Sequence, residues 1–367
     1  MKEIIIGISI LMGMIIGGGI FALPYAFFKG GFLLSTILLL IITISICFLH
    51  LFYLEIIHQN KKPHRFIGYI QENLGNKFKI IATILLLGSF WASLLIYLIL
   101  GANFLSHLFQ LNFNASLFLF FSLGSVLIYL GLKKISLIQF LGSFFLAGTI
   151  IFLFFKAIPK MNPSFISYDI NLNNFFLPYG ALLYSLYGRA AIPELSTLIS
   201  SFKKQKFVII LGTILPAILY FLFVLTILAT SKNVFPYPEK NLSKIFGKDI
   251  IFLFNFFGFF SVFTSFLIIG SNLKESFFFD FSLPKNLSFF LTVFVPLFFY
   301  FLGVKDFIKT IDFCGGVFLA INSILLLLSY LKLKQKRYPL FLPYLLIFIF
   351  ILGVLWQGFN LFKTIIY

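Results

Sequence analysis

The chain has 367 residues, of which 60% are hydrophobic and only 11% are charged. Soluble proteins carry about 25% charged residues, so this composition excludes a soluble globular protein and indicates one whose solvent is the lipid bilayer. The net charge of +17 does not indicate a nucleic-acid partner, because the sequence contains no soluble basic domain and the positive-inside rule accounts for much of the excess.

Apolar runs of about 20 residues are long enough to cross a bilayer. The polar segments between them are richer in Lys and Arg on the side where the N-terminus would lie. This bias predicts a multi-pass protein of the plasma (inner) membrane, with a cytoplasmic N-terminus and an external C-terminus. The sequence predicts eleven spans, near 4–28, 32–57, 79–105, 115–132, 136–158, 172–200, 206–230, 249–279, 286–304, 307–331 and 340–362.

The polar segment 58–78 separates the second span from the third. Its apolar residues Phe66, Ile67, Ile70 and Leu74 recur at helical spacing among polar residues. This pattern predicts a short helix that lies on the cytoplasmic face of the membrane.

The first span is interrupted between residues 12 and 24, which read MGMIIGGGIFALP. Gly costs roughly 1 kcal/mol relative to Ala in a helix interior and Pro about 3 kcal/mol, so three consecutive glycines and Pro24 predict a break in the helix. At membrane depth, irregular backbone is tolerated only where it is buried in protein or lines a cavity. The alternative for this stretch is close helix packing by small residues.

The sixth span contains a second interruption, because Gly188 and Pro193 lie within LPYGALLYSLYGRAAIPELSTLI. The segments 19–24 and 188–193 share the pattern Gly-x-x-Ala-aliphatic-Pro. Interrupted spans at corresponding places in two halves of a chain point to the binding site of a secondary transporter. We therefore expect two inverted repeats, at about 4–158 and 172–331, with 340–362 as an extra helix, all within one transmembrane domain over 1–367.

Several of these stretches resemble motifs of the amino acid–polyamine–organocation (APC) superfamily, and most closely its amino acid/auxin permease and aromatic amino acid permease branches. GGGIFALPYAF resembles the first-helix motif, LYGRAAIPEL the sixth-helix motif, RFIGYIQENLG the loop between helices 2 and 3, and FFSVFTSFLIIG the eighth helix. The resemblance covers roughly residues 1–330. It implies an all-α LeuT-type fold of five-plus-five inverted repeats plus an eleventh helix, with helices 1 and 6 broken. It also implies an amino acid symporter.

A zwitterionic substrate needs donors for its carboxylate and acceptors for its ammonium group. Backbone amides at the start of a half-helix suit the carboxylate, and freed carbonyl groups suit the ammonium. Trp91, Tyr97 and Phe260 are further candidates for the wall of the site, with simple packing as the alternative. The predicted substrate-binding residues are Met14, Ile15, Gly17, Gly18, Gly19, Trp91, Tyr184, Ser185, Tyr187, Gly188 and Phe260.

Thr264 and Ser265 are adjacent hydroxyl residues in the eighth span. In sodium-coupled members of the resembling fold a similar pair completes a Na⁺ site with carbonyl groups of helix 1, which by position are those of Met12 and Ile15. Oxygen ligands suit such a hard cation. The alternative is that both hydroxyls bond back to their own helix. The resemblance implies Na⁺ or H⁺ as the coupling ion. H⁺-coupled proteins of the resembling fold often carry a basic residue in the fifth span, and 136–155 has none, which favours Na⁺.

Charged residues within spans are functional candidates by default. Glu194 follows Pro193 and is expected to pair with Arg189 or to latch onto helix 1, with proton transfer as the sharper alternative. Asp312 lies near the outer end of the tenth span. Some proteins of the resembling fold pair such an acid with an arginine in helix 1, but here that position is Ala22, so the gate is not expected.

The sequence contains no nucleotide-binding loop and no His/Cys spacing typical of a metal centre. We therefore expect a transporter that imports neutral or aromatic amino acids, and neither an enzyme nor a protein with a resident cofactor. The expected partners are the amino acid substrate and the lipid bilayer, with a monomer favoured over a dimer. A passive channel or facilitator is one alternative function, and a non-transporting amino acid sensor is another.

Overall fold

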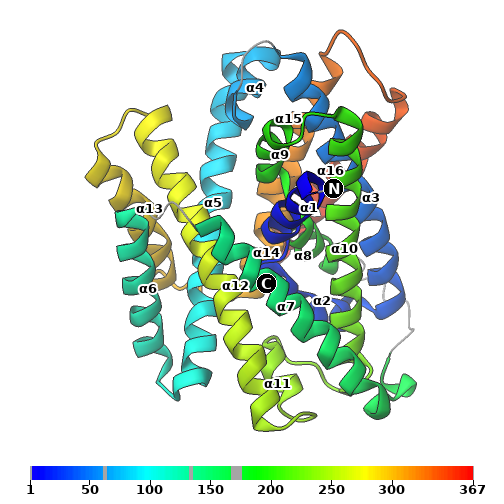
Figure 1. Ribbon diagram of the computed structural model, residues 1–367, viewed down its shortest axis with the longest axis vertical. Coiled ribbons are helices and arrows are strands. Elements are labelled where there is room, and N and C mark those ends of the chain that lie inside the picture. Colours follow the sequence, from blue (N-terminus) through cyan, green and yellow to red (C-terminus); the bar gives the residue numbers. More distant parts are fainter. Residues whose placement is uncertain (1, 61–63, 132–134, 167–175, 367) are drawn as a thin grey trace.

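The long apolar runs of the sequence form a bundle of helices in a computed structural model that describes residues 2–60, 64–131, 135–166 and 176–366. Figure 1 shows α1, α8 and α14 near the middle of the bundle and α6 and α13 at one edge. The longer helices are α1 (Lys2–Ile15), α3 (Phe32–Gln59), α5 (Asn76–Phe109), α6 (Phe113–Leu130), α7 (Ile135–Ala157), α10 (Phe202–Leu228), α12 (Lys248–Glu275), α13 (Lys285–Phe301), α15 (Ala320–Leu331) and α16 (Phe341–Ile366).

Shorter helices complete the described chain. The α-helices among them are α2 (Leu23–Gly30), α4 (Phe66–Leu74), α8 (Leu177–Leu186), α9 (Ile192–Leu198), α11 (Pro238–Leu242) and α14 (Phe307–Phe313). The 3₁₀ turns are η1 (Gly18–Ala22), η2 (Ile158–Lys160), η3 (Pro163–Phe165) and η5 (Arg189–Ala191), and the π-helical turns are η6 (Ser276–Asp280) and η7 (Cys314–Leu319). The short helix α4 forms where the apolar spacing of 66–74 predicts one.

Seven helices of the described chain are long and apolar enough to cross a membrane, and the number is eight when α1 and its bent continuation count as one span. The other predicted spans coincide with α7, with the pair α8 and α9, and with the 17-residue α13. Residue 132 of the fourth predicted span and residues 172–175 of the sixth lie outside the described residues. The predicted all-α polytopic architecture is confirmed.

Helix 1, the first spanning helix, is broken as predicted. α1 ends at Ile15, and the chain restarts at Gly18 with its axis bent by 47°. Gly17 at the break is extended, with φ −137° and ψ −150°, so its amide and carbonyl groups leave the helical ladder. Pro24 lies in the first turn of α2 and not at the break. A proline there costs little, because the first amides of a helix have no partner within it.

Helix 6, the sixth spanning helix, is broken in the same way. α8 ends at Leu186, Tyr187 and Gly188 leave the helix, and the turn η5 leads into α9. Pro193 lies in the first turn of α9, as Pro24 does in α2. The residue before each restarted α-helix has nearly the same backbone angles, −82° and −24° for Ala22 against −78° and −19° for Ala191. The motif shared by the two sequence segments thus encodes one local structure used twice.

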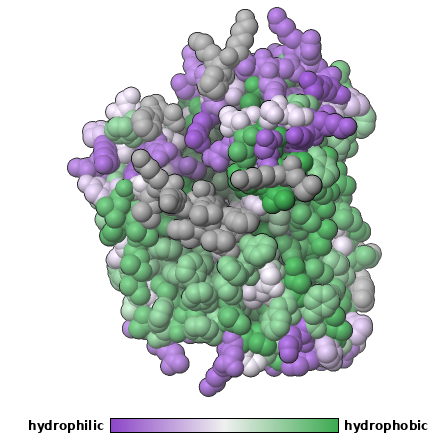
Figure 2. Space-filling model, viewed as in Figure 1, coloured by the Kyte–Doolittle hydropathy of each residue, from purple (hydrophilic) through white to green (hydrophobic). Residues whose placement is uncertain are grey.

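The surface of the bundle carries a broad apolar belt. Figure 2 shows hydrophobic residues over most of one face, with hydrophilic residues gathered at the two ends. Large side chains such as Leu40, Phe118, Phe290, Phe298 and Phe348 are at least half exposed. An apolar surface of this size fits a protein whose outer face contacts lipid.

The centre of the bundle depends on the close approach of two backbones. A Cβ atom on Gly315, in the π-helical turn η7, would overlap the carbonyl oxygen of Gly180 in α8. A Cβ atom on Gly180 would in turn overlap the backbone of Asp312. Small residues at such contacts let membrane helices pack without a gap.

We predict that Gly315→Ala destabilises the protein by about 1–3 kcal/mol, because the added methyl group forces two backbones apart. The matched control is Gly148→Ala in α7, where a Cβ atom meets no other atom within 4 Å. Thermal unfolding of both variants in detergent measures the effect. Equal melting temperatures for G315A and the wild type would contradict the prediction.

Candidate functional site

The two helix breaks face a common cavity of about 100 Å³. Residues from both breaks line it, together with one face of α5, one face of α12 and the turn η7. The lining residues are Met14, Ile15, Gly17, Gly19, Leu86, Ser89, Phe90, Ser93, Tyr97, Tyr184, Ser185, Tyr187, Arg189, Ala190, Ser265, Ile268, Ile269 and Leu319. The cavity thus combines freed backbone groups, small hydroxyl residues and aromatic rings.

Most of the predicted substrate-binding residues lie in this lining, namely Met14, Ile15, Gly17, Gly19, Tyr184, Ser185 and Tyr187. Gly18 and Gly188 lie outside it. A Cβ atom on Gly18 would come within 2.9 Å of the Tyr97 ring, and one on Gly188 would come within 2.7 Å of both Ile15 and Leu11. These two glycines allow close packing around the cavity.

Trp91 and Phe260, predicted as wall residues, do not line the cavity. The Trp91 indole donates a hydrogen bond to the carbonyl of Leu291 in α13 at 3.0 Å, and the Phe260 ring packs against Phe256. Helical geometry explains both misplacements. The α5 residues in the lining are spaced mostly three or four apart, so they form one stripe, and Trp91 falls outside it. Phe260 is likewise off the α12 face that carries Ser265.

The stripe on α5 includes Tyr97, which the sequence indicated as a candidate wall residue, and two serines that were not among the candidates. Ser89, Ser93 and Tyr97 follow one another at intervals of four and all line the cavity. A stripe of polar residues in an otherwise apolar span is a sequence signal for a face turned away from lipid. That signal could have found this wall of the site.

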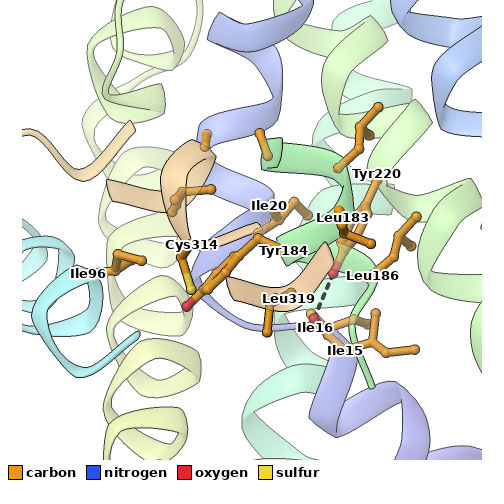
Figure 3. Close-up of a cluster of buried hydrophobic side chains, with 14 of the residues drawn as sticks. Ile15, Ile16, Ile20, Ile96, Leu183, Tyr184, Leu186, Tyr220, Cys314 and Leu319 are labelled. Carbon is orange, nitrogen blue, oxygen red and sulfur yellow. Dashed lines mark hydrogen bonds between the residues drawn. The ribbon is translucent and has the colours of Figure 1, made fainter. Parts of the chain in front are cut away.

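The Tyr220 hydroxyl joins the two breaks. Tyr220 lies in α10, is fully buried, and its hydroxyl is 2.8 Å from the carbonyl oxygen of Ile15 and 2.9 Å from that of Ser185. Figure 3 shows its ring reaching from α10 to the end of α1 beside Ile15 and Ile16. A phenol has one proton to donate, so the two carbonyls share it. Nothing in the local sequence of α10 indicates this role.

The predicted ion ligands are engaged elsewhere in this structure. The hydroxyls of Thr264 and Ser265 donate to carbonyls of their own helix at 2.8 Å, which is the alternative that the sequence left open. The Met12 carbonyl accepts the Ile16 amide at 2.7 Å, and the Ile15 carbonyl is bound by Tyr220. α12 contacts helix 1 just after the predicted ligand Ile15. Ser261 donates to the Ile16 carbonyl at 3.4 Å, and Ser265 lies against Gly17.

Arg189 and Glu194 do not form the predicted pair. The Arg189 guanidinium stacks on the Phe66 ring of α4, with its central carbon 3.5 Å from the ring centroid, and only 5% of the residue is exposed. Glu194 is exposed on α9 and takes part in none of the ion pairs between described residues. Their spacing of five residues places the side chains on different faces, and the ring contact holds the arginine away.

Asp312 lies in α14, outside the cavity lining. Its surroundings are Gly180 of α8 and Gln357 of α16, whose side-chain amide donates to the Asp312 carbonyl at 3.5 Å. In the described chain no arginine pairs with it.

A larger cavity of about 590 Å³, called the vestibule here, lies against α4. It shares Leu86, Phe90, Arg189 and Ala190 with the lining of the smaller cavity. Its wall includes the exposed residues Gln71 and Glu275, so it reaches the surface of the protein. The site at the breaks therefore adjoins a cavity that reaches the α4 end of the bundle.

The opposite end, which carries α11, is closed by aromatic packing. The fully buried rings of Phe21, Phe104, Phe223 and Phe254 contact one another with centroid distances between 4.9 and 6.2 Å. They come from η1, α5, α10 and α12. These four rings, called the aromatic plug here, therefore join four elements.

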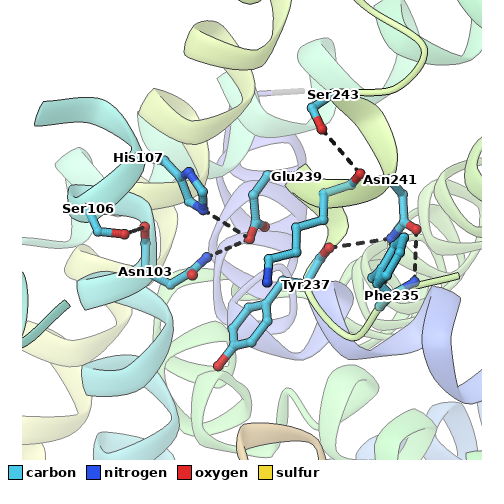
Figure 4. A network of polar contacts seen from close by, with 9 residues as sticks. Asn103, Ser106, His107, Phe235, Tyr237, Glu239, Asn241 and Ser243 are labelled. Carbon is cyan, nitrogen blue, oxygen red and sulfur yellow. Dashed lines mark hydrogen bonds and ion pairs between the residues drawn. The ribbon is translucent and has the colours of Figure 1, made fainter. Parts of the chain in front are cut away.

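A polar network fastens α11 over this closed end (Figure 4). The buried Glu239 of α11 accepts a hydrogen bond from Asn103 of α5 at 2.8 Å and lies 3.5 Å from the imidazole of His107. Burial, followed by the charge of Glu239, raises the pKa of Tyr237 to about 12, so this phenol stays protonated at neutral pH. The vestibule thus lies at the α4 end of the bundle, and this network lies at the α11 end.

The fold and the site together define a transporter of the LeuT type. The profile of the tryptophan/tyrosine permease family matches residues 1–344, and the chain belongs to that family. None of the curated proteins compared with the chain matches its sequence.

Three solved structures show the same fold. MhsT in complex with L-phenylalanine is 13% identical, with a TM-score of 0.68 over 95% of this chain and 98% of that one. A manganese transporter of Eremococcus coleocola, in complex with an aromatic bis-isothiourea substituted compound, is 15% identical, with a TM-score of 0.65 over 95% and 84%. Mhp1, a nucleobase-cation-symport-1 family transporter with bromovinylhydantoin bound, is 11% identical, with a TM-score of 0.62 over 87% and 76%.

We predict that Tyr220→Phe lowers the stability of the protein by about 1–3 kcal/mol, because it leaves buried carbonyls at both breaks without their donor. Uptake of substrate should fall as well, since those carbonyls border the cavity. The control is Tyr344→Phe, which removes a hydroxyl from a side chain that is 59% exposed. Wild-type melting temperature and uptake in Y220F would show that the hydroxyl does not hold the breaks.

Proposed function

We propose that this protein is a secondary active transporter that imports aromatic amino acids, with tryptophan and tyrosine as the first candidates. The observation that carries the proposal is the cavity formed where helices 1 and 6 both break. Support comes from the name of the family and from the ligand of the neighbouring structure, L-phenylalanine bound to MhsT. Placement in the APC superfamily, within its amino acid/auxin or aromatic amino acid permease branches, is part of the proposal.

The proposed binding mode uses the two breaks for the backbone of the substrate. Amide groups of Gly17, Gly18 and Gly19, at the start of the restarted helix, receive the carboxylate. Carbonyl groups near Met14, and those between Tyr184 and Tyr187, receive the ammonium group. The rings of Phe90 and Tyr97 in the lining give an aromatic side chain apolar contact.

The size of the cavity bears on how a substrate fits. Sites for drug-sized ligands usually enclose about 300–1,000 Å³, and the cavity at the breaks measures about 100 Å³. A bound aromatic amino acid would therefore extend past Phe90 and Arg189 towards the vestibule, or displace the rings that border the cavity. Rearrangement of aromatic side chains on binding is common even where the backbone is fixed.

In the proposed orientation the α4 end faces the cytoplasm, the N-terminus is cytoplasmic and the C-terminus is external in the plasma (inner) membrane. The structure then corresponds to an inward-facing conformation, with the plug of Phe21, Phe104, Phe223 and Phe254 on the external side. The proposed functional unit is a monomer. Two inverted repeats, at about 4–158 and 172–331, would exchange this conformation for an outward-facing one.

The direct test is uptake into proteoliposomes. We expect concentrative uptake of L-tryptophan or L-tyrosine under an inward Na⁺ or H⁺ gradient, and loss of uptake in Gly18→Leu, because the larger side chain displaces Tyr97 and Leu100. Gly148→Leu is the matched control, since a Cβ atom there meets open space. Absence of uptake for all twenty amino acids would reject the proposal, and normal uptake by G18L would reject the site.

The coupling ion is proposed to be Na⁺, with H⁺ as the alternative. If the Ser265 hydroxyl turns to bind Na⁺ in the transport cycle, Ser265→Ala should lower the apparent Na⁺ affinity at least about tenfold, the strength of one contact to a charged group. Ser45→Ala is the control, because Ser45 is also buried, donates to its own helix at 2.8 Å and lines neither cavity. Uptake driven by a pH gradient and indifferent to Na⁺ would assign the coupling to H⁺ instead.

A further inference from the structure

Arg189 is a buried cation whose guanidinium lacks an acceptor. The guanidinium forms no hydrogen bond or ion pair with the described residues. Its Nη1 atom is fully buried without a partner, and the residue as a whole is 5% exposed. Its contacts are ring faces, Phe66 at 3.5 Å and Tyr187 at 5.3 Å. A ring face attracts the positive charge but does not satisfy the N–H groups in the guanidinium plane.

The position of Arg189 indicates what could supply the missing acceptor. The residue lies in the turn that follows the helix 6 break, and it lines both the cavity and the vestibule. Any solute that passes between the two must pass the shared residues, and among those that the structure describes Arg189 is the only charged one. A buried charge is normally paired, so the missing partner at this point can be a group of the passing solute.

The charge of the vestibule selects the sign of that group. The described residues of its lining include the cations Arg65, Lys79 and Arg189 but a single carboxylate, that of Glu275. A cleft lined mainly by one sign of charge concentrates solutes of the opposite sign. The planar fork of an arginine matches a carboxylate in particular, because two parallel N–H groups can donate to its two oxygens.

We infer that, in this conformation, Arg189 binds the carboxylate of the substrate between the cavity and the vestibule, and that the amides of Gly17, Gly18 and Gly19 receive it only once the substrate has moved fully into the cavity. The inference rests on the proposed amino acid transport and deepens it. Phe66 covers one face of the guanidinium but accepts no hydrogen bond from its N–H groups, so these groups can donate to a substrate that moves against them. The site accepts zwitterions and anions that carry a carboxylate, and it rejects amines and cationic amino acids through repulsion by Arg189.

The experiment compares three probes that differ in their charged groups: L-tryptophan, tryptamine, which lacks the carboxylate, and indole-3-propionate, which lacks the ammonium group. Binding to purified full-length protein is measured by thermal-shift titration. In Arg189→Gln, the affinities for tryptophan and indole-3-propionate should fall at least about tenfold. The affinity for tryptamine should stay the same or rise, because a repelling charge is removed.

Two further variants keep this test decisive. Arg337→Gln is the matched control, because the Arg337 guanidinium also stacks on a ring, that of Phe202 at 4.0 Å, but lines neither cavity. Its affinities should equal those of the wild type. If R189Q does not fold, Arg189→Lys, which keeps the charge but loses the planar fork, should still weaken tryptophan binding relative to tryptamine binding.

The outcomes separate the inference from the proposed function. Equal losses for all three probes, or no loss for any, overturn the role of Arg189 even if the wild type transports tryptophan. Binding that depends on chloride, with the preference for carboxylates unchanged in R189Q, assigns Arg189 to an inorganic anion and overturns it too. If the wild type takes up no amino acid but binds indole-3-propionate through Arg189, the carboxylate site stands and the proposed transport fails.

Discussion

A backbone carbonyl that leaves its helix inside a membrane has no water to bond to, and the arrangement around the two breaks follows from that constraint. α1 ends at Ile15 and α8 ends at Leu186, so each exposes carbonyl groups at the same depth of the bundle. The Tyr220 hydroxyl lies between them and bonds to the carbonyls of Ile15 and Ser185. The two breaks therefore depend on one donor from a third helix.

Much of this arrangement could be predicted from the sequence, because its causes are local. Glycine and proline act on the backbone within one or two turns, and the motif ending in Pro24 and Pro193 encodes the same restarted helix twice. The order of the helices along the chain follows the order of the apolar runs, although only seven of the described helices, or eight with the bent pair, are long and apolar enough to cross a membrane. The position of each break is harder to predict, because the prolines do not lie at the breaks. Pro24 and Pro193 lie where the second half-helix begins, and the interruptions lie earlier, at Gly17 and Gly188.

The errors arise where the outcome depends on the rotation of a helix. Trp91 and Phe260 lie on the correct spans but on faces turned away from the cavity, because an apolar span gives little information about which face meets protein. Tyr220 escapes prediction for the same reason, since one tyrosine among the apolar residues of α10 has no distinguishing neighbour. Arg189 is unusual already in the sequence, but its partner, Phe66, comes from a helix 123 residues earlier in the chain.

If the protein works by the proposed alternating access, the asymmetry between the two ends of the bundle indicates which parts would move. α1 and α9 lie on the α4 side of their breaks, while α2 and α8 lie on the side of the aromatic plug. Closing the vestibule would bring α1 and α9 towards α4, with the breaks as hinges. Leu11 of α1 packs against Gly188 and Gly212, so α1 is coupled by close contact both to the helix 6 break and to α10.

Because α1 contacts both the helix 6 break and α10, Tyr220 of α10 lies where the moving segments of the proposed motion meet. α10 carries both Gly212, which receives Leu11, and Tyr220, which binds the ends of α1 and α8. A hydroxyl that can donate to either of two carbonyls keeps one bond while the other lengthens. The breaks can therefore change their separation while at least one of the two carbonyls keeps its donor.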